Sequence, residues 1–386
     1  MKDKLLILFA CWALSGNMQL HAQDLPQTLS SKLAFSGQVS AWSNYNFDNE
    51  LPLQLGGRYI PTMEYDITLP NTHLLDFELA ANIYGTVSAH PFDSIATDGN
   101  VTPYRAWVRY STQQFELRLG LQKIDFGSST LLRPLQWFNE IDPRDPLKLT
   151  NGVYAALGRY YFLNNANIWV WMLYGNEKTR GFDRVESNIK IPEFGGRIQH
   201  PTPRGEMALS YHHRTANVLS ILPLSQYEKI PEDRFGIDGK WDVKVGLWVE
   251  ATHSIKHKDI GIGTNQSLFN VGSDYTFGIG NGLNVVLEHL YITIDHEPFE
   301  FTNSTHITAS NISYPLGLFD AVSTIVNYNW NKRNMSFFIN YSHEFPCFSG
   351  YVMAYYNPRT QDDIQQNKLL NNTSGPGIRL MLVYNH

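Results

Sequence analysis

Apolar and polar residues alternate along most of this chain in segments of about ten residues. In the segment 73–87, Leu75 and Phe77 lie on one face of an extended chain, and Asp76 and Glu78 lie on the other. This period of two is typical of a β-strand with one apolar and one polar face. The pattern predicts seventeen strands between residues 32 and 384, and a weaker alternation within 299–311 would make eighteen.

The links between these segments alternate between short and long. The links 163–166 and 278–282 are short, whereas 176–192 and 215–233 are long. Short turns at one end and longer loops at the other are typical of a transmembrane β-barrel, which closes because an open sheet edge in lipid leaves backbone groups unpaired. No run of 18 apolar residues follows the first segment, which excludes transmembrane helices. We predict an all-β, antiparallel transmembrane barrel of 16–18 strands, with 18 favoured because such barrels have even numbers.

The longest connection lies between the strands 115–122 and 153–162. It covers 128–151, about 25 residues, far above the usual loop of about 4–6. A connection with its own apolar side chains should fold back onto the strands that carry it, which in a barrel means into the lumen. Its apolar residues are Leu131, Leu132, Leu135, Trp137, Phe138 and Ile141.

Charged side chains that face the lumen are the candidates for solute selection. The segment 102–110 sets Arg105 and Arg109 on the lumen face, against Tyr104 and Ala106 on the lipid face. An arginine at the lipid midplane would cost ~2–4 kcal/mol, so the charges should point inward. Charged side chains at the narrowest point set the selectivity of a channel. The pore-lining and constriction candidates are Arg105, Arg109, Glu116, Arg118, Arg133, Glu140, Asp142, Arg144, Asp145 and Lys148.

A structural role for the same charges stays open. Wall charges of mixed sign are expected in any water-filled barrel. The loop charges could pair with the wall and only hold the loop in place, which is the favoured interpretation for 142–145.

The N-terminus and the composition point to export. Lys2 and Lys4 precede an apolar run, and a small-residue cleavage site follows at Ala22, so residues 1–22 are predicted to be a signal peptide and 23–386 a single barrel domain. A lipoprotein site at Cys11 is the alternative. Removal of Lys2, Asp3 and Lys4 changes 30 basic and 36 acidic residues into 28 and 35, a net charge of −7, which does not suggest a nucleic-acid partner. Cys347 alone then remains, so no internal disulfide is expected.

Enzymatic and metal-binding patterns are weak in this chain. Ser210 and His212 share a strand face, as a lipid hydrolase would require, but that face should point into the lumen. His253 and His257 are four residues apart, a spacing that suits a metal on a helix but not on a strand. We therefore expect neither an enzyme nor a metal or other cofactor.

The segment LRLGLQKIDFGSSTLLRPLQWFNEIDPRDPLKLTNGVYAALGRYYF resembles the corresponding region of porin-like bacterial outer-membrane families, the alginate-export and phosphate-selective groups. In these families a strand with the pattern Arg-x-Gly-x-Gln, here Arg118, Gly120 and Gln122, precedes a loop that enters the barrel. The similarity covers about 50 of 386 residues, and the chain ends in His386 instead of the terminal aromatic residue of many such proteins.

The resemblance implies passive transport of a polar solute and names no solute. We predict an outer-membrane porin-like channel for uptake or export of small polar, including anionic, solutes, narrowed by 128–151. Its expected partners are outer-membrane lipid, lipopolysaccharide, the solute and further copies in a homo-oligomer. A plugged barrel with an adhesive or structural role is the alternative, and an outer-membrane lipid hydrolase is the weaker one.

Overall fold

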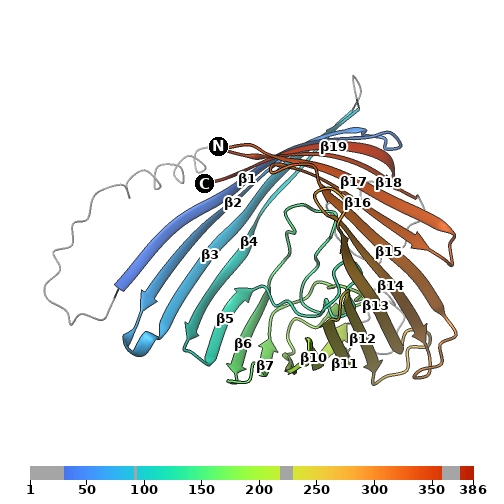
Figure 1. Ribbon diagram of the computed structural model, residues 1–386. Coiled ribbons are helices and arrows are strands. Elements are labelled where there is room, and N and C mark those ends of the chain that lie inside the picture. Colours follow the sequence, from blue (N-terminus) through green and yellow to red (C-terminus); the bar gives the residue numbers. More distant parts are fainter. Residues whose placement is uncertain (1–29, 91–93, 218–228, 359–373) are drawn as a thin grey trace, which may run out of the picture.

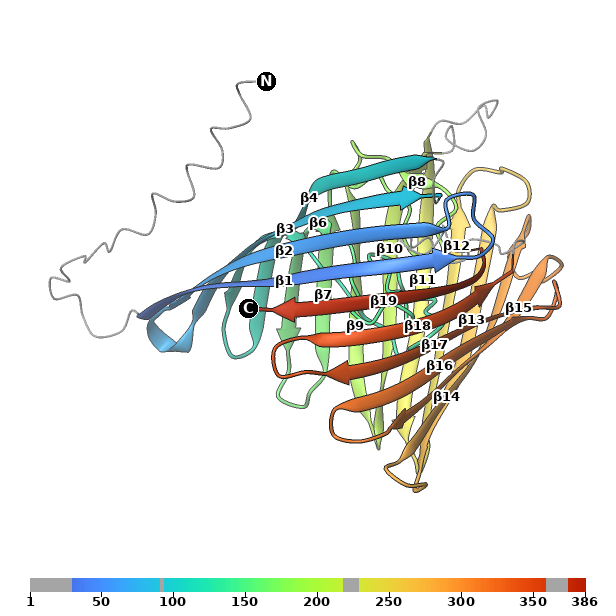
Figure 2. The ribbon, with the colours of Figure 1, turned by 90° about the horizontal axis from the view of Figure 1, so that it is seen from above.

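The computed structural model describes residues 30–90, 94–217, 229–358 and 374–386. The predicted signal peptide lies outside these ranges. Within them, nineteen strands form one antiparallel sheet, and one of these, β8 (Glu186–Ser187), has only two residues. The sheet closes into a barrel of eighteen longer strands because β1 (Ser30–Asn46) pairs with both β2 (Leu53–Thr68) and β19 (Gly375–Asn385) (Figures 1 and 2). The prediction of an 18-stranded barrel is confirmed.

The strands follow one another around the barrel in chain order, and the two-residue β8 pairs with β10 beside β9. A strand forms where the weak alternation predicted one, at β15. Among the described residues, no helix is both long and apolar enough to cross a membrane. The remaining elements are β3 (Leu74–Ala89), β4 (Ile95–Ser111), β5 (Phe115–Gln122), β6 (Val153–Tyr161), β7 (Asn167–Leu173), β9 (Glu193–Thr202), β10 (Gly205–Asn217), β11 (Lys229–Asp242), β12 (Gly246–Lys256), β13 (Asn265–Phe277), β14 (Leu283–Asp295), β15 (Ser304–Pro315), β16 (Asp320–Asn329), β17 (Asn334–Glu344), β18 (Ser349–Asn357) and the 3-10 turn η1 (Pro70–Thr72).

The two faces of the wall differ as the alternation predicted. Leu209 on β10 is opposite Ile198 and Ile237, and these three outward-facing side chains are 62%, 59% and 41% exposed. Its neighbour Ser210 points inward and is buried. The apolar outer face suits lipid, and the polar inner face contains the groups that lipid could not solvate.

A β-bulge on β4 corrects one predicted orientation. The pairing of β3 with β4 shifts between Ala80 and Ala81, so that Ala80 is opposite Arg105 and Ala81 is opposite Pro103. Tyr104 is therefore the extra residue, and its ring lies on the lumen side, 4.0 Å from the Arg105 guanidinium. The expectation that Tyr104 faces lipid was wrong, because a bulge places two consecutive side chains on one face.

Strand lengths explain where the long connection enters the barrel. β1 to β4 have 16 or 17 residues, whereas β5, β6 and β7 have 8, 9 and 7. β5 therefore ends partway along β4, and the segment 123–152 leaves the wall there. Figure 1 shows this segment, in teal and green, running through the interior between the two sides of the barrel.

Candidate channel constriction

The segment 123–152, here called the lumen loop, crosses the barrel and binds the far wall. Glu288 on β14 is fully buried and accepts hydrogen bonds from three consecutive backbone amides of the loop. The donors are the amides of Thr130 at 2.7 Å, Leu131 at 3.2 Å and Leu132 at 2.6 Å. A carboxylate that accepts several N–H groups makes charge-assisted bonds, about twice as strong as neutral ones.

A second buried carboxylate extends this attachment. Glu250 on β12 accepts from the amides of Ser129 at 2.6 Å and Leu135 at 3.2 Å. Asn270 on β13 lies between the two acids and donates to the Leu132 carbonyl at 2.7 Å. Three neighbouring strands thus bind the backbone of one stretch of the loop, largely independently of its side chains.

Apolar packing fixes the same loop on two sides of the barrel. Ile124, Phe126, Leu135, Trp137 and Phe138 are buried against a cluster that includes wall residues of β6 and β7. Leu131 and Leu132 instead pack against a cluster on β13, β14 and β15. The prediction that the apolar residues of the connection draw it into the lumen is therefore confirmed.

The later part of the loop reaches the wall near the chain termini. Arg144 forms an ion pair with Asp142 at 2.8 Å and donates to Asn357 on β18 at 3.3 Å. Burial alone would lower the pKa of Arg144, but the charge of Asp142 outweighs it, so that this pKa lies above its ordinary value. Burial raises the pKa of the Asp145 carboxyl, although the two loop amides that donate hydrogen bonds to it act to lower this pKa. Asp142, Arg144 and Asp145 thus bond mainly within the loop, and only Arg144 also reaches the wall. The structural role of 142–145 stays a prediction.

The other predicted loop residues, Arg133, Glu140 and Lys148, form hydrogen bonds within the lumen loop. Arg133 pairs with Asp125 at 2.6 Å and donates to the carbonyls of Ser129 and Phe126. Glu140 has its amide bonded to the Thr150 hydroxyl at 3.1 Å. Lys148 donates its amide to the Asp145 carbonyl in a turn with a positive φ of 47°.

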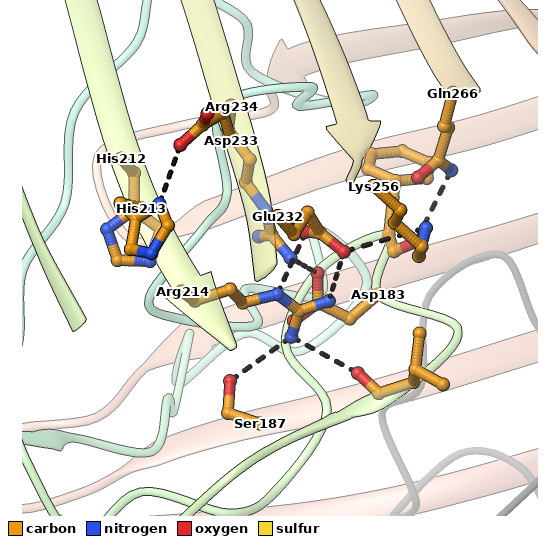
Figure 3. Close-up of polar contacts among 12 residues, drawn as sticks. Asp183, Ser187, His212, His213, Arg214, Glu232, Asp233, Arg234, Lys256 and Gln266 are labelled. Atoms are coloured by element: carbon orange, nitrogen blue, oxygen red, sulfur yellow. Dashed lines mark hydrogen bonds and ion pairs between the residues drawn. The ribbon is translucent and has the colours of Figure 1, made fainter. Parts of the chain in front are cut away.

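A second inward segment, 174–192, packs against the lumen loop. Its Asp183 carboxylate binds Arg214 at 3.0 Å and Arg234 at 2.5 Å, and both arginines also bind Glu232. Figure 3 shows Arg214 surrounded by these acids and by Ser187, with Lys256 on the far side of Glu232. All of these groups are buried. A Cβ on Gly181 would lie 2.1 Å from the Gln136 carbonyl, so the two segments are in close backbone contact.

The predicted wall arginines lie on one inner surface, and two of the three are paired with carboxylates. Arg109 pairs with Asp76 at 2.6 Å. Glu116 pairs with both Arg118 at 3.1 Å and Arg159 at 3.5 Å. Arg105 differs, because it donates hydrogen bonds to two carbonyls, those of Tyr104 and Thr150.

Two further arginines were missed by sequence reasoning. Arg58 on β2 lies 5.7 Å from the rings of both Trp42 and Tyr84, and Arg379 lies on β19. The Nε atoms of both are buried without a hydrogen-bond partner among the described residues. The alternation places both side chains on the inner face, but only the closed barrel brings β2 and β19 to the two sides of β1.

The residues considered for catalysis or metal binding are engaged separately. Ser210 accepts a bond from Arg197 at 3.1 Å, whereas His212 contacts Glu193 at 3.0 Å and Trp171 at 3.2 Å. His253 bonds to Ser267 and His257 to Asp233. Ser210 and His212 thus do not form the pair that a serine hydrolase requires.

Comparisons with known proteins define the class through the fold. No protein-family model and no curated protein matches the chain by sequence. Among solved structures, the barrel is similar to OccAB1 of Acinetobacter baumannii, with 9% identity and a TM-score of 0.56 over 92% of this chain and 96% of that one. OccAB4 of the same organism has 10% identity and a TM-score of 0.54, over 94% of this chain and 100% of that one. The anion-selective porin from Comamonas acidovorans has 11% identity and a TM-score of 0.50, over 92% of this chain and 100% of that one.

The protein therefore shares its β-barrel fold with bacterial porins. The narrower resemblance to the alginate-export and phosphate-selective groups stays a prediction.

Proposed function

We propose that the protein is an outer-membrane channel for passive passage of small polar solutes, narrowed by the lumen loop. The observation that carries the proposal is the loop's path: it leaves β5, binds Glu288 on β14 and reaches Asn357 on β18. Barrels of 16–18 strands are wide enough to leave a water-filled channel, so a segment that crosses one reduces its cross-section. Solved structures with the same fold include the anion-selective porin from Comamonas acidovorans, which supports the proposal.

The proposed location is the outer membrane, reached through the N-terminal signal peptide. The apolar outer wall would contact membrane lipid, with lipopolysaccharide on the side of the longer loops, and further copies of the chain would form a homo-oligomer. Nucleic acid is not a proposed partner, because the chain carries a net negative charge.

The proposed preference is for anions, and it rests on Arg58, Arg105 and Arg379. Arg109 is paired with Asp76, whereas Arg118 and Arg159 share Glu116, so these three arginines together keep one net positive charge. Within the described ranges neither Arg58 nor Arg379 forms an ion pair, so their positive charges would attract a passing carboxylate or phosphate. The other charged candidates would shape the constriction by positioning the loop and the adjoining wall. They are Glu116, Arg133, Glu140, Asp142, Arg144, Asp145 and Lys148.

The experiment that tests the proposal is single-channel recording of refolded residues 23–386 in a planar bilayer under a salt gradient. We expect discrete conductance steps and a reversal potential whose sign indicates a preference for anions. Steps with cation preference would refute the anion assignment alone. A correctly folded barrel that gives no steps would refute the channel.

A plugged barrel with an adhesive or structural role is the second candidate, and one observation favours it. Both inward segments are fixed by buried polar groups, Glu288 for the lumen loop and Asp183 for 174–192. If these segments fill the cross-section, the same recordings will show no steps until one of them is removed. A lipid hydrolase is the weaker alternative, because Ser210 and His212 are bonded to other groups.

A further inference from the structure

The outer wall has an apolar groove that channel function does not require. It has a volume of about 1060 Å³ and extends across β7 and β9–β14. Small outward residues form its floor, with Ala251 opposite Ile237 and Phe269, and Ser267 opposite His253. Larger side chains such as Phe235 and Phe269, each 49% exposed, form its sides. The groove faces away from the lumen, toward the surrounding membrane.

The link between β14 and β15 covers one end of the groove. Phe299 and Phe301 in this link both line the groove, and both have φ of 58°, a left-handed conformation that is unfavourable for a bulky side chain. Such strain persists only where the surroundings impose it, and it gathers at ligand clamps and other functional sites.

A buried carboxylate imposes that conformation. Asp295, at the end of β14, accepts hydrogen bonds from the amides of Phe301, Thr302 and Asn303, each at 3.1 Å. The hydroxyls of Thr302 and Thr293 donate to the same carboxylate. Five donors on one side chain hold the link in a shape that directs two phenylalanine rings onto the outer wall.

At the covered end of the groove, the imidazole of His253 has one nitrogen without a partner within the described ranges. His253 bonds to Ser267 through Nδ1 at 2.7 Å, and its ring is stacked on Phe299 with centroids 4.2 Å apart. Its Nε2 is buried and lacks a hydrogen-bond partner among the described residues. A ligand in the groove could bond to this atom through an ester or hydroxyl oxygen, whereas a purely apolar neighbour could not.

We propose that this groove binds one acyl chain of a membrane lipid, held under the Phe299 and Phe301 rings, with a polar atom of the lipid bonded to His253 Nε2. A membrane barrel's outer wall is surrounded by lipid, so acyl chains are the apolar ligand at hand. The volume is that of a small-molecule site, whereas a second copy would need about 800 Å² per partner to form a stable interface. The proposal rests on the outer-membrane location but not on conduction.

The test uses the full-length mature barrel in vesicles of phosphatidylethanolamine and phosphatidylglycerol that contain a trace of lipid with a photoreactive diazirine at mid-chain. After irradiation, mass spectrometry maps the labelled residues. Ala251→Trp fills the floor of the groove, and Phe299→Ala removes part of its cover. The matched control is Ala354→Trp on β18, because Ala354 is also outward-facing between two exposed isoleucines, Ile339 and Ile378.

We expect labelling of β11–β13 to exceed that of β16–β19 several-fold, and to fall to the background in Ala251→Trp but not in Ala354→Trp. Equal labelling of both walls would overturn the proposal, as would labelling of the groove that Ala251→Trp does not reduce. If Ala251→Trp does not fold, as judged by heat-dependent gel mobility, the wild-type map and Phe299→Ala decide: labelling of the groove should fall in Phe299→Ala, and labelling equal to that of the wild type would overturn the proposal. Failure of the channel proposal is separately visible, because conductance does not depend on the groove.

Discussion

The Glu288 carboxylate accepts a 2.6 Å hydrogen bond from the backbone amide of Leu132, 156 positions earlier in the chain. This bond joins β14 to a segment that begins at β5, on another part of the barrel wall. It shows that the lumen loop is attached at both sides and is not a free connection. The first prediction concerns this attachment.

Glu288→Gln should loosen the lumen loop without unfolding the barrel. The amide group keeps one acceptor but places an N–H₂ against amide donors, and each buried donor left unpaired costs about 1–3 kcal/mol. Trypsin should then cleave at Lys148 faster than in the wild type, and current noise should rise. Glu206→Gln is the control, because Glu206 is exposed and bonded to the side chain of Gln199. Unchanged cleavage in Glu288→Gln would contradict the anchoring role.

Deletion of residues 133–148 should increase single-channel conductance. The deletion removes the part of the loop that packs Trp137 and Phe138 against β6 and β7 and brings Arg144 to β18, and the remaining ends can still join β5 to β6. Conductance equal to that of the wild type would show that the loop is not the constriction. If only the deleted form conducts, the plugged-barrel candidate is correct.

Neutralising Arg58 and Arg379 together should lower anion preference. A unit charge about 10 Å from an ion in water contributes roughly 0.4 kcal/mol with opposite sign for an anion and a cation, so each removed charge should change the anion-to-cation ratio about fourfold. The double variant Arg58→Gln and Arg379→Gln is compared with Arg109→Gln combined with Asp76→Asn, which removes an ion pair and keeps the net charge. The reversal potential in a salt gradient is the readout, and equal shifts in the two variants would argue against selectivity by the unpaired arginines.

Asp183→Asn should release the segment 174–192 from the wall. The substitution leaves Arg214 and Arg234 with Glu232 as their shared acid, and breaking a buried ion pair costs about 3–5 kcal/mol. Hydrogen exchange of residues 174–192 should accelerate, with little change in the strands. Asp259→Asn, which removes an exposed pair with His296, serves as the control. Slow exchange in Asp183→Asn would mean that packing alone holds the segment.

The ion pair between Asp125 and Arg133 predicts how the loop responds to acid. Burial raises the pKa of the Asp125 carboxyl, but the charge of Arg133 outweighs this, so the pKa lies below its ordinary value of 3.8. The stabilisation is therefore present above that ordinary value and is lost as the pH falls through the lowered pKa. Current noise should rise only in strongly acidic solution for the wild type, and already at neutral pH for Asp125→Asn. A rise near pH 6 in the wild type would assign the acid response to another group.

Alternation in the sequence was sufficient to predict the barrel, because every strand must present one face to lipid and one to water. It also predicted the inward path of the loop, since six apolar side chains between two strands need a buried surface. The roles of Glu250 and Glu288 were not predictable. A glutamate on the inner face has the same local pattern whether it lines the pore or binds a distant backbone amide.

The sequence by itself determined the strand number to within one pair, the orientation of nearly all wall residues and the segment that enters the lumen. Only the tertiary structure decided the rest. The bulge at Tyr104 depends on the register between two strands, and the contacts of the lumen loop depend on which strands lie across the barrel. Arg58 and Arg379 are 321 positions apart and become neighbours of β1 because the sheet closes on itself. Closure is a property of the whole sheet, and no local pattern records it.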